Sequence, residues 1–286
     1  MTIARFSRVA VVGANSQIGG FLLPRLISAG YSVFSIGREA SKSDGGQIYA
    51  FDERIMIFNP PLQAADAIIS LAPLPNIKTI MTMAAVLGAK RVIAFGSTGR
   101  FSKIGSAALV EQDFVEQQIE AERLFEKMSR TNGVAWTLFR PTMIYGADAD
   151  QNVAFIKSII GCFRFFPLPF GAKGLRQPVH ADDLAAACVA AIDCQKSFNC
   201  AYDLGGGERL EYADMVRRIF AVKNKKARII RVPASLLYCL VTACSKLPKY
   251  SFVRKEMVER MFQDLTADNY PAQKDFEYCP RRFLAD

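Results

Sequence analysis

The chain has 286 residues, of which 51% are hydrophobic and 22% are charged, and its formal net charge is +9. This balance is that of a globular protein and excludes a disordered chain. No uninterrupted run of about 18 apolar residues occurs, which excludes a membrane-spanning helix, and the first residues lead straight into an apolar strand pattern without room for a signal peptide. We therefore expect a cytoplasmic α/β protein.

Strand-like apolar runs alternate with helical segments through the first half of the chain. Such alternation predicts a Rossmann-type, doubly wound parallel sheet, in which ligands bind at the carboxyl ends of the strands. The predicted strands are 9–12, 31–36, 48–51, 67–71, 91–95 and 136–139, and the predicted helices are 18–28, 77–87 and 109–130.

The regular alternation ends near residue 145. We predict a dinucleotide-binding core over residues 1–145 and a smaller C-terminal α/β lobe over 146–286, which covers the substrate and returns part of the chain to the core sheet. The predicted elements of this half are helices 153–160, 183–192, 235–246 and 252–264, and a strand over 201–204.

The first strand ends at a turn with the pattern Gly13-x-x-Ser16-x-x-Gly19, which leads into a helix. Glycine is needed where backbones approach closely, and the free amides and dipole of a helix start favour a diphosphate. Ser16 replaces the middle glycine usual here and can cap the helix or donate to a phosphate. A tight turn without ligand is the alternative. The predicted cofactor contacts are Gly13, Asn15, Ser16, Gln17, Ile18 and Gly19.

The ends of the second and third strands bear on which dinucleotide is bound. Arg38 follows the second strand, where an acidic residue would favour NAD and an arginine can pair with a 2′-phosphate. NADP is therefore favoured and NAD is the alternative. Asp52 ends the third strand and could contact the adenine amine. A surface arginine and a helix-capping aspartate are the other interpretations of these two residues.

The order of motifs resembles the extended and atypical members of the short-chain dehydrogenase/reductase superfamily, the NAD(P)-dependent epimerase/dehydratase group. The resemblance implies that Leu71 and Ala72 lie beside the cofactor and that Pro141 contacts its nicotinamide. It implies a catalytic hydroxyl on Thr98 and a diphosphate-binding role for Arg176. The implied substrate is a nucleotide sugar or a similar metabolite. The segments that carry the resemblance are 13–19, 66–72, 95–99, 140–146, 176–185, 202–206 and 278–281.

The chain departs from that family at its proton-transfer pair. The family uses Tyr-x-x-x-Lys, in which the lysine lowers the tyrosine pKa so that the phenol can pass a proton. Here the corresponding positions hold Phe114 and Gln118, and neither side chain can exchange a proton. Standard catalysis is therefore not available.

Two interpretations of this departure remain open. Another acid could act in the same pocket: Thr98, Tyr145, or a carboxylate such as Asp113 or Glu116, although the carboxylates fit a solvated helix face better. The chain is then an NAD(P)-binding epimerase/dehydratase-like or reductase-like enzyme with non-standard catalysis. Otherwise it is a non-enzymatic NADP(H)-binding regulator or assembly/accessory protein. A homodimer paired through the helix that carries Phe114 is also expected from the resemblance.

The remaining features point to structural roles. His180 is the sole histidine and lies in the motif that joins the two lobes. The seven cysteines lack zinc-site spacing, so we expect buried, reduced thiols and no metal. The basic residues between 223 and 231 suit a solvated face or an anionic ligand, without the aromatic pattern of nucleic-acid binding. The last helices could rest on a membrane surface, although packing against the core is simpler.

Overall fold

The computed structural model describes residues 6–37, 41–43, 46–52, 57–59, 64–146, 152–245 and 254–284. Its main sheet has the strand order β13-β8-β7-β6-β1-β2-β4-β3, and every neighbouring pair from β13 to β4 is parallel. This confirms the predicted Rossmann-type parallel sheet. The parallel strands are β1 (Arg8–Val12), β2 (Ser32–Gly37), β4 (Gly46–Asp52), β6 (Ala67–Ser70), β7 (Arg91–Phe95), β8 (Ala135–Pro141) and β13 (Cys200–Leu204).

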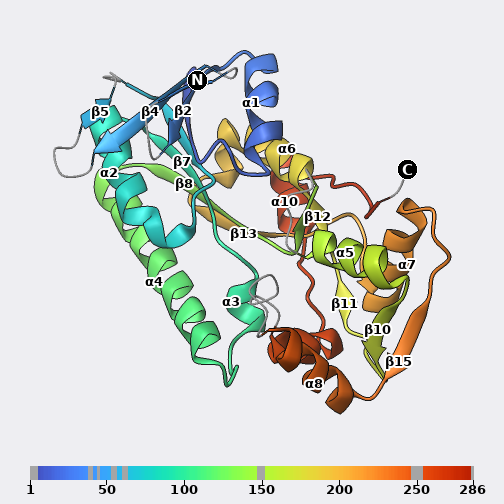
Figure 1. The fold of residues 1–286 in the computed structure, drawn as a ribbon. Coiled ribbons are helices and arrows are strands. Elements are labelled where there is room, and N and C mark those ends of the chain that lie inside the picture. Colours follow the sequence, from blue (N-terminus) through green and yellow to red (C-terminus); the bar gives the residue numbers. More distant parts are fainter. Residues whose placement is uncertain are drawn as a thin grey trace.

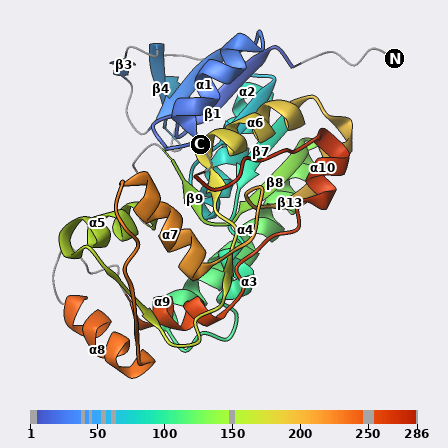
Figure 2. The ribbon, with the colours of Figure 1, turned by 90° about the vertical axis from the view of Figure 1, so that its right-hand side faces the viewer.

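Helices cover both faces of this sheet (Figures 1 and 2). Side chains alternate along a strand, so Val9 and Val11 of β1 face one apolar cluster, while Ala10 and Val12 face the other. The first cluster includes residues of α1 (Gly19–Ser28), α6 (Ala181–Ile192) and α10 (Tyr270–Phe276). The second includes residues of α2 (Ile77–Leu87) and α4 (Leu109–Asn132).

The strand order places a crevice at the end of β1. Because β1 lies between β2 and β6, the chain leaves it toward one side of the sheet and later returns on the other. Doubly wound sheets bind ligands at such a switch point, outside the carboxyl ends of the strands. Gly13 is the first residue beyond that end of β1.

Two short antiparallel strands beside β4 were not predicted. β3 (Ser41–Ser43) and β5 (Ile57–Asn59) both pair with β4. Antiparallel neighbours of this kind need only short connections, and three-residue strands leave little periodic signal in a sequence. They extend the sheet on the β4 side without altering the order of the parallel strands.

A smaller lobe lies beside the carboxyl edge of the sheet (Figure 2). It has its own apolar core, in which Ile156 and Ile160 of α5 meet Val216 and Phe220 of α7. Its elements are α5 (Val153–Phe163), β10 (Phe166–Pro169), β11 (Leu175–Arg176), β14 (Leu210–Glu211), α7 (Tyr212–Val222), β15 (Ile229–Val232), α8 (Ala234–Cys244), α9 (Lys255–Glu259) and the 3-10 helix η4 (Arg260–Phe262).

Parts of the second half of the chain lie on the core sheet. β13 pairs with β8, and α6 and α10 pack on the sheet. The helix predicted over 252–264 is shorter and changes to 3-10 geometry at Arg260, and residues 252 and 253 lie outside the described part of the chain. The domain boundary at residue 145 stays a prediction. The remaining short elements are η1 (Leu74–Asn76), α3 (Gly99–Ser102), β9 (Ile144–Tyr145), β12 (Val179–His180) and η2 (Gln195–Ser197).

An ion-pair network ties the C-terminal segment to the core. Asp182, at the start of α6, pairs with two arginines. The Arg25 Nε atom of α1 lies 2.6 Å from Asp182 Oδ1, and the Arg281 Nη2 atom lies 2.6 Å from Asp182 Oδ2. The Arg281 Nε atom also lies 2.8 Å from Asp183 Oδ1. The hydrogen bonds from Arg25 and Arg281, against an opposing effect of burial, lower the pKa of Asp182 to about 2. The carboxylate is therefore ionised at neutral pH.

The cysteines are less buried than we predicted. Cys188 is a buried free thiol, whereas Cys162, Cys239 and Cys279 are exposed free thiols, because they lie on outer helix faces and near the C-terminus. Within the described ranges, no helix has the length and apolar character needed to cross a bilayer. The same residues contain no group of three or more His, Cys, Asp or Glu arranged to hold a metal ion.

Candidate functional site

The turn after β1 requires glycine at both of its ends. Gly13 has φ +77°, and its amide donates to the Ile36 carbonyl at 3.2 Å. A Cβ atom on Gly19 would lie 2.0 Å from the Ala14 carbonyl oxygen, which no side chain can accommodate. The Ser16 hydroxyl accepts the Gly19 amide at 3.3 Å. The turn is therefore packed closely against the start of α1, as phosphate-binding turns of this kind are.

The end of β6 closes this turn from the other side. The Leu71 amide donates to the Val12 carbonyl at 2.9 Å. The Ala72 nitrogen and the Leu71 carbonyl carbon lie 3.4 Å from the Cβ position of Gly13. The structure thus brings Leu71 and Ala72 to the glycine turn. Ile18 is buried in the first apolar cluster, while Asn15 is exposed.

Gln17 stands at the boundary between the turn and a cavity. It lines the cavity, and its buried side-chain oxygen Oε1 has no hydrogen-bond partner. The structure does not describe the side chains of the two residues that we predicted to contact the adenosine end of the cofactor. Arg38 lies outside the described residues, and Asp52 ends β4 with a side chain that is not described.

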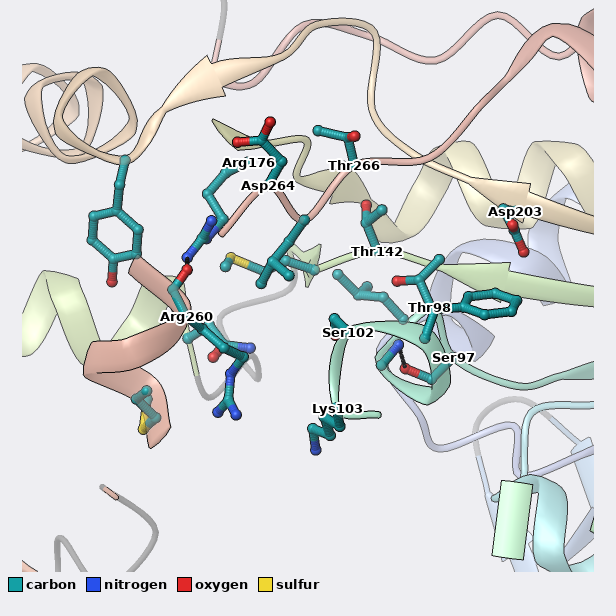
Figure 3. Close-up of a pocket in the computed structure, with 18 of the residues that line it drawn as sticks. Ser97, Thr98, Ser102, Lys103, Thr142, Arg176, Asp203, Arg260, Asp264 and Thr266 are labelled. Atoms are coloured by element: carbon teal, nitrogen blue, oxygen red, sulfur yellow. Dashed lines mark hydrogen bonds between the residues drawn. The ribbon is translucent and has the colours of Figure 1, made fainter. Parts of the chain in front are cut away.

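A cavity of about 770 Å³ lies between the sheet edge and the small lobe (Figure 3). Ser97, Thr98 and Thr142 line it where β7 and β8 end, and Arg176 and Arg260 line it from the small lobe. Other lining residues are Lys103, Met143, Ile144, Asp203, Tyr212, Asp264 and Thr266.

Thr98 joins the ends of β7 and β8. Its hydroxyl donates to the Pro141 carbonyl at 3.1 Å, and its amide donates to the same oxygen at 3.2 Å. The Ser97 hydroxyl accepts the Gly99 amide at 3.0 Å. The structure therefore brings together Thr98 and Pro141, the two residues to which the resemblance gives a catalytic hydroxyl and a nicotinamide contact.

Tyr145 lies apart from this cavity, among none of its lining residues. It is buried, and its hydroxyl accepts the Leu284 amide at 3.4 Å. Its ring packs edge-on against Phe283 and His180, with centroids 4.8 and 5.0 Å away. Burial raises the pKa of Tyr145, so the phenol is protonated at neutral pH. His180 caps α6, because its Nδ1 atom accepts the Asp182 amide at 3.1 Å.

Phe114 and Gln118, one helical turn apart on α4, flank the end of β7. A Cβ atom on Gly99 would lie 3.4 Å from Phe114 Cε1, and one on Gly96 would lie 3.5 Å from Gln118 Oε1. Gln118 is only 5% exposed, and its Oε1 atom has no hydrogen-bond partner. Both residues therefore lie beside the strand end that carries Thr98.

The two carboxylates that we considered as substitute acids lie outside the cavity. Asp113 and Glu116 are exposed on α4 and do not line the cavity. Glu122, one turn beyond Gln118, holds Arg140 through Nε–Oε1 3.0 Å and Nη2–Oε2 2.8 Å. Arg140 in turn reaches Asp203 Oδ1 at 3.2 Å. Asp203 is thus a cavity carboxylate already paired with a cation, which sequence patterns did not indicate.

Arg176 is buried and bound to backbone. Its Nη1 atom donates to the carbonyls of Leu175 and Gln263, both at 2.8 Å, and its Nη2 atom donates to the Arg260 carbonyl at 2.5 Å. Its guanidinium carbon lies 5.0 Å from the centroid of the Tyr212 ring. Burial lowers the pKa of Arg176 to about 10, so it keeps its charge. The guanidinium of Arg176, which we predicted to bind a diphosphate, is therefore already hydrogen-bonded to the protein backbone.

Sequence reasoning also missed a charged cluster in which α4 of the core contacts η4 of the small lobe. Glu111, in the first turn of α4, is buried and accepts a hydrogen bond from Arg260 Nη1. Lys103 Nζ lies 3.8 Å from the same carboxylate oxygen. Arg260 lies 149 positions from Glu111 in the chain, so no local spacing could have indicated this pair.

Comparisons with known proteins agree with this fold. No family model matches the chain. It is 24% identical over 178 residues to a UDP-glucose 4-epimerase of Vibrio cholerae, a match that covers 62% of this chain and 51% of the relative. It is 23% identical over 173 residues to an uncharacterized protein of Sinorhizobium fredii, covering 59% and 42%. The chain thus spans about half the length of the curated relatives it matches.

Solved structures match nearly the whole chain. An NADPH-dependent quinone oxidoreductase of Escherichia coli, complexed with NADPH, superposes with a TM-score of 0.71 at 16% identity, covering 96% of this chain and 97% of that one. A short-chain dehydrogenase/reductase superfamily protein of Agrobacterium tumefaciens with bound NAD gives 0.69 at 10%, covering 96% and 93%. MoeE5 in complex with UDP-glucose and NAD gives 0.66 at 17%, covering 97% and 95%. The resemblance inferred from the sequence is confirmed at the level of the fold.

Proposed function

We propose that the chain binds a nicotinamide dinucleotide across the carboxyl ends of β1 and β6 and acts on a small polar metabolite in the adjoining cavity. The observation that carries this proposal is the turn in which the Ala14 carbonyl oxygen lies 2.0 Å from the Cβ position of Gly19, directly before α1. A glycine turn that leads into a helix at this point of a doubly wound sheet is where a diphosphate binds. The similarity to structures with bound NADPH or NAD supports the same assignment.

Two unpaired amide oxygens fit the polar part of such a cofactor. Gln17 Oε1 and Gln118 Oε1 are both buried without a hydrogen-bond partner. A buried acceptor without a partner costs about 1–3 kcal/mol, which a ligand hydroxyl group would recover. Gln118 occupies the family's lysine position, so we assign its oxygen to a hydroxyl group of the nicotinamide ribose. We assign Gln17 to the cofactor where the turn meets the cavity.

We propose NADP as the cofactor in preference to NAD. The reason is Arg38, which follows β2 and can pair with a 2′-phosphate where an acidic residue would select NAD. Asp52 remains the proposed contact for the adenine amine. Calorimetric titration with NADPH and NADH should give the tighter binding with NADPH, and the Arg38→Ala variant should reduce that preference. Equal affinities would contradict the choice of NADP.

The proposed reaction is hydride exchange with a nucleotide sugar or a similar metabolite, in the manner of an epimerase or a reductase. When bound, the cofactor supplies the hydride. We assign the hydroxyl group that contacts the substrate to Thr98, because Thr98 lines the cavity and lies beside Pro141. It would give its hydrogen bond to a substrate oxygen instead of to the Pro141 carbonyl. Phe114 lies beside Gly99, at the strand end that carries Thr98, and offers no proton donor there.

A turnover assay distinguishes the proposed enzyme from a non-enzymatic NADP(H)-binding protein. Purified protein with NADP⁺ or NADPH is incubated with UDP-glucose and, separately, with a quinone, and products are followed by NMR and by cofactor absorbance. We expect conversion that the Thr98→Val variant loses while still binding NADPH. Conversion that Thr98→Val retains in full would contradict the assigned role of Thr98.

The second candidate is a non-enzymatic NADP(H)-binding regulator or accessory protein. Phe114 and Gln118 favour it, because neither can pass a proton. It predicts that NADPH binds and raises the melting temperature by mass action, while no substrate of either class is converted. Tight binding without turnover would therefore select this candidate over the enzyme.

A further inference from the structure

Helix α8 is apolar on both its inner and its outer side. Leu237, on the inner side, is buried in the core of the small lobe, against which Tyr238 and Val241 pack. The outer side carries four exposed residues at the helical spacing i, i+3, i+4 and i+7, which we call the α8 face: Leu236, Cys239, Leu240 and Ala243. Surface helices ordinarily have polar residues on the side that faces solvent. The α8 face therefore has the composition of a contact surface.

The α8 face belongs to a projecting end of the small lobe, away from the main sheet (Figures 1 and 2). Two exposed aromatic residues lie near the start of α8. Phe170 follows β10, and its amide donates to the Val232 carbonyl at 3.0 Å, two residues before α8 begins. The Phe262 Cε1 atom lies 4.0 Å from the Cβ position of Gly171. Exposed apolar side chains gathered in this way are typical of an interaction site.

The chain that builds this end of the lobe is basic and free of acidic residues. The sequence has no aspartate or glutamate over 152–181 or over 215–245, the stretches that supply α5, β10, β15 and α8. Four exposed cations lie on β15 and on the connection before it: Lys223, Lys226, Arg228 and Arg231. From Arg228 to the start of α8 at Ala234 the chain spans at most about 20 Å, so positive charge lies close to the α8 face.

We propose that α8 and the basic chain before it dock on an anionic lipid membrane. The α8 face enters the boundary between headgroups and acyl chains, and Lys226 and Arg228 contact the headgroup phosphates. Apolar burial and attraction to anionic lipids add in such a contact. A lipid surface is favoured over a protein partner because it needs no matching shape, and the apolar residues stand on a projecting end of the lobe.

The length of α8 agrees with a helix that lies in the plane of the membrane surface. Its 11 residues extend about 16 Å, roughly half the thickness of the hydrocarbon core of a bilayer. None of the residues assigned to the docking surface lines the cavity. The proposal is therefore independent of the proposed function, and the cavity stays accessible while α8 is bound to lipid.

Vesicle co-sedimentation with the whole protein measures the interaction. One set of vesicles is phosphatidylcholine alone, and the other contains about 30% phosphatidylserine. We expect the wild type to bind the anionic vesicles about tenfold or more tightly than the neutral ones, and added salt to weaken this binding, because salt screens the cations. Equal binding to the two sets, or no binding to the anionic set, would overturn the proposal.

A leucine pair tests the apolar contribution. Leu236→Gln/Leu240→Gln should bind the anionic vesicles about tenfold more weakly, because two side chains that are 49% and 46% exposed no longer enter the lipid. Ile27→Gln, at an exposed position of α1, is the control and should bind as the wild type does. All these positions are on the surface, so the melting temperatures should stay close to that of the wild type.

A cation pair tests the basic contribution. Lys226→Gln/Arg228→Gln should bind the anionic vesicles about tenfold or more weakly. Arg123→Gln/Lys127→Gln removes the same net charge from exposed positions of α4 and should change the binding little. Wild-type binding by either the leucine pair or the cation pair would overturn the proposal, which requires both contributions.

The exposed thiol of Cys239 reports whether the α8 face itself meets the lipid. Its modification by a water-soluble maleimide, followed at each cysteine by mass spectrometry, should be largely lost when anionic vesicles are added. Cys279, an exposed thiol near the C-terminus, is the internal control and should react as before. Unchanged modification of Cys239 on vesicle-bound protein would contradict the assigned surface.

A second copy of the chain is the other occupant that these measurements recognise. Analytical ultracentrifugation would then show a dimer that Leu236→Gln/Leu240→Gln dissociates, and Cys239 would be protected without vesicles. That result would overturn the lipid assignment. Neither the vesicles nor the maleimide involve a nucleotide, so failure of this proposal leaves the dinucleotide-binding proposal to its own titrations.

Discussion

The Lys103 ammonium nitrogen lies 4.1 Å from the centroid of the Phe114 ring. A cation over an aromatic face is attracted by the ring quadrupole. Phe114 is the residue that we align with the proton-donating tyrosine of the family that this chain resembles. The position is apolar but lies within the field of a nearby cation. A phenol placed here would be exposed to that positive charge, which favours its ionised form.

Phe114→Tyr should therefore give a tyrosine whose pKa is lower than that of an exposed tyrosine. The matched control is Phe163→Tyr, at a position 63% exposed. Ultraviolet difference titration of each variant against the wild type measures the added phenol. We expect the phenol at 114 to titrate at lower pH than the one at 163. A higher titration midpoint at 114 would mean that burial, and not Lys103, dominates there.

Adding a lysine to that tyrosine should restore family-type catalysis. Phe114→Tyr/Gln118→Lys rebuilds the pair one helical turn apart on α4. General acid–base catalysis contributes about 10²–10⁴-fold in rate, so turnover of a productive substrate should rise by about 10². Steady-state kinetics with NADPH give the measurement. No gain, with cofactor binding intact, would show that the substrate does not reach this side of the pocket.

Gln118→Met should separate stability from cofactor binding. The Oε1 atom of Gln118 is buried without a partner, so a methionine of similar length should raise the free energy of unfolding of the cofactor-free protein by up to about 1 kcal/mol. It should weaken NADPH binding, because the proposed ribose contact is lost. The exposed neighbour Gln117→Met is the control and should change neither quantity. Stronger NADPH binding by Gln118→Met would contradict the assignment.

Gly19 and Gly20 form a matched pair for the turn. A Cβ on Gly19 would meet the Ala14 carbonyl, whereas nothing lies within 4 Å of one on Gly20. Gly19→Ala should destabilise the fold by about 2–3 kcal/mol and weaken NADPH binding. Gly20→Ala should stabilise the exposed start of α1 by about 0.5–1 kcal/mol. Denaturant unfolding with and without NADPH gives both numbers. Equal behaviour of the two variants would disprove the close approach.

The Asp182 network should stabilise the protein in a pH-dependent manner. The pKa of Asp182 in the folded protein is about 2, against an ordinary value of 3.8, chiefly because of the hydrogen bond from Arg25. Its contribution is therefore complete above about pH 4 and is lost as the pH falls through about 2. With a discount for solvent screening, Asp182→Asn should cost about 1 kcal/mol at pH 7 and much less at pH 2.

Urea unfolding at the two pH values measures this difference. Asp214→Asn, which removes a solvent-exposed pair with Arg217, is the control and should show little effect at either pH. A stability loss for Asp182→Asn that is the same at pH 2 and pH 7 would contradict a role of its charge.

The sequence predicted the parts of the fold that depend on local pattern. The strand over 91–95 and the helix over 77–87 have the predicted bounds, because continuous apolar runs and amphipathic periodicity coincide with burial there. The tight turn from Gly13 to Gly19 was also predicted, because a close approach of two backbone segments admits only glycine at position 19. The structural interpretation of His180 agrees with its place as the cap of α6.

The side-chain partners that depend on tertiary contacts could not be predicted from the sequence. Arg176 matched a motif, yet carbonyls from residues 260 and 263 decide what its guanidinium contacts. Arg91 reads as an ordinary first residue of a strand, but it is fully buried and donates to Ile192, Thr137 and Ser197. Such partners lie more than 40 positions away, and no spacing rule connects them.

The central claim is that the glycine turn after β1 holds a nicotinamide dinucleotide. Isothermal titration of the purified wild type with NADPH, repeated with Gly20→Ala and Gly19→Ala, tests it most directly. We predict saturable one-to-one binding for the wild type and for Gly20→Ala, and strongly weakened binding for a folded Gly19→Ala. Absence of a binding isotherm for NADPH and NADH with the folded wild-type protein would contradict the claim.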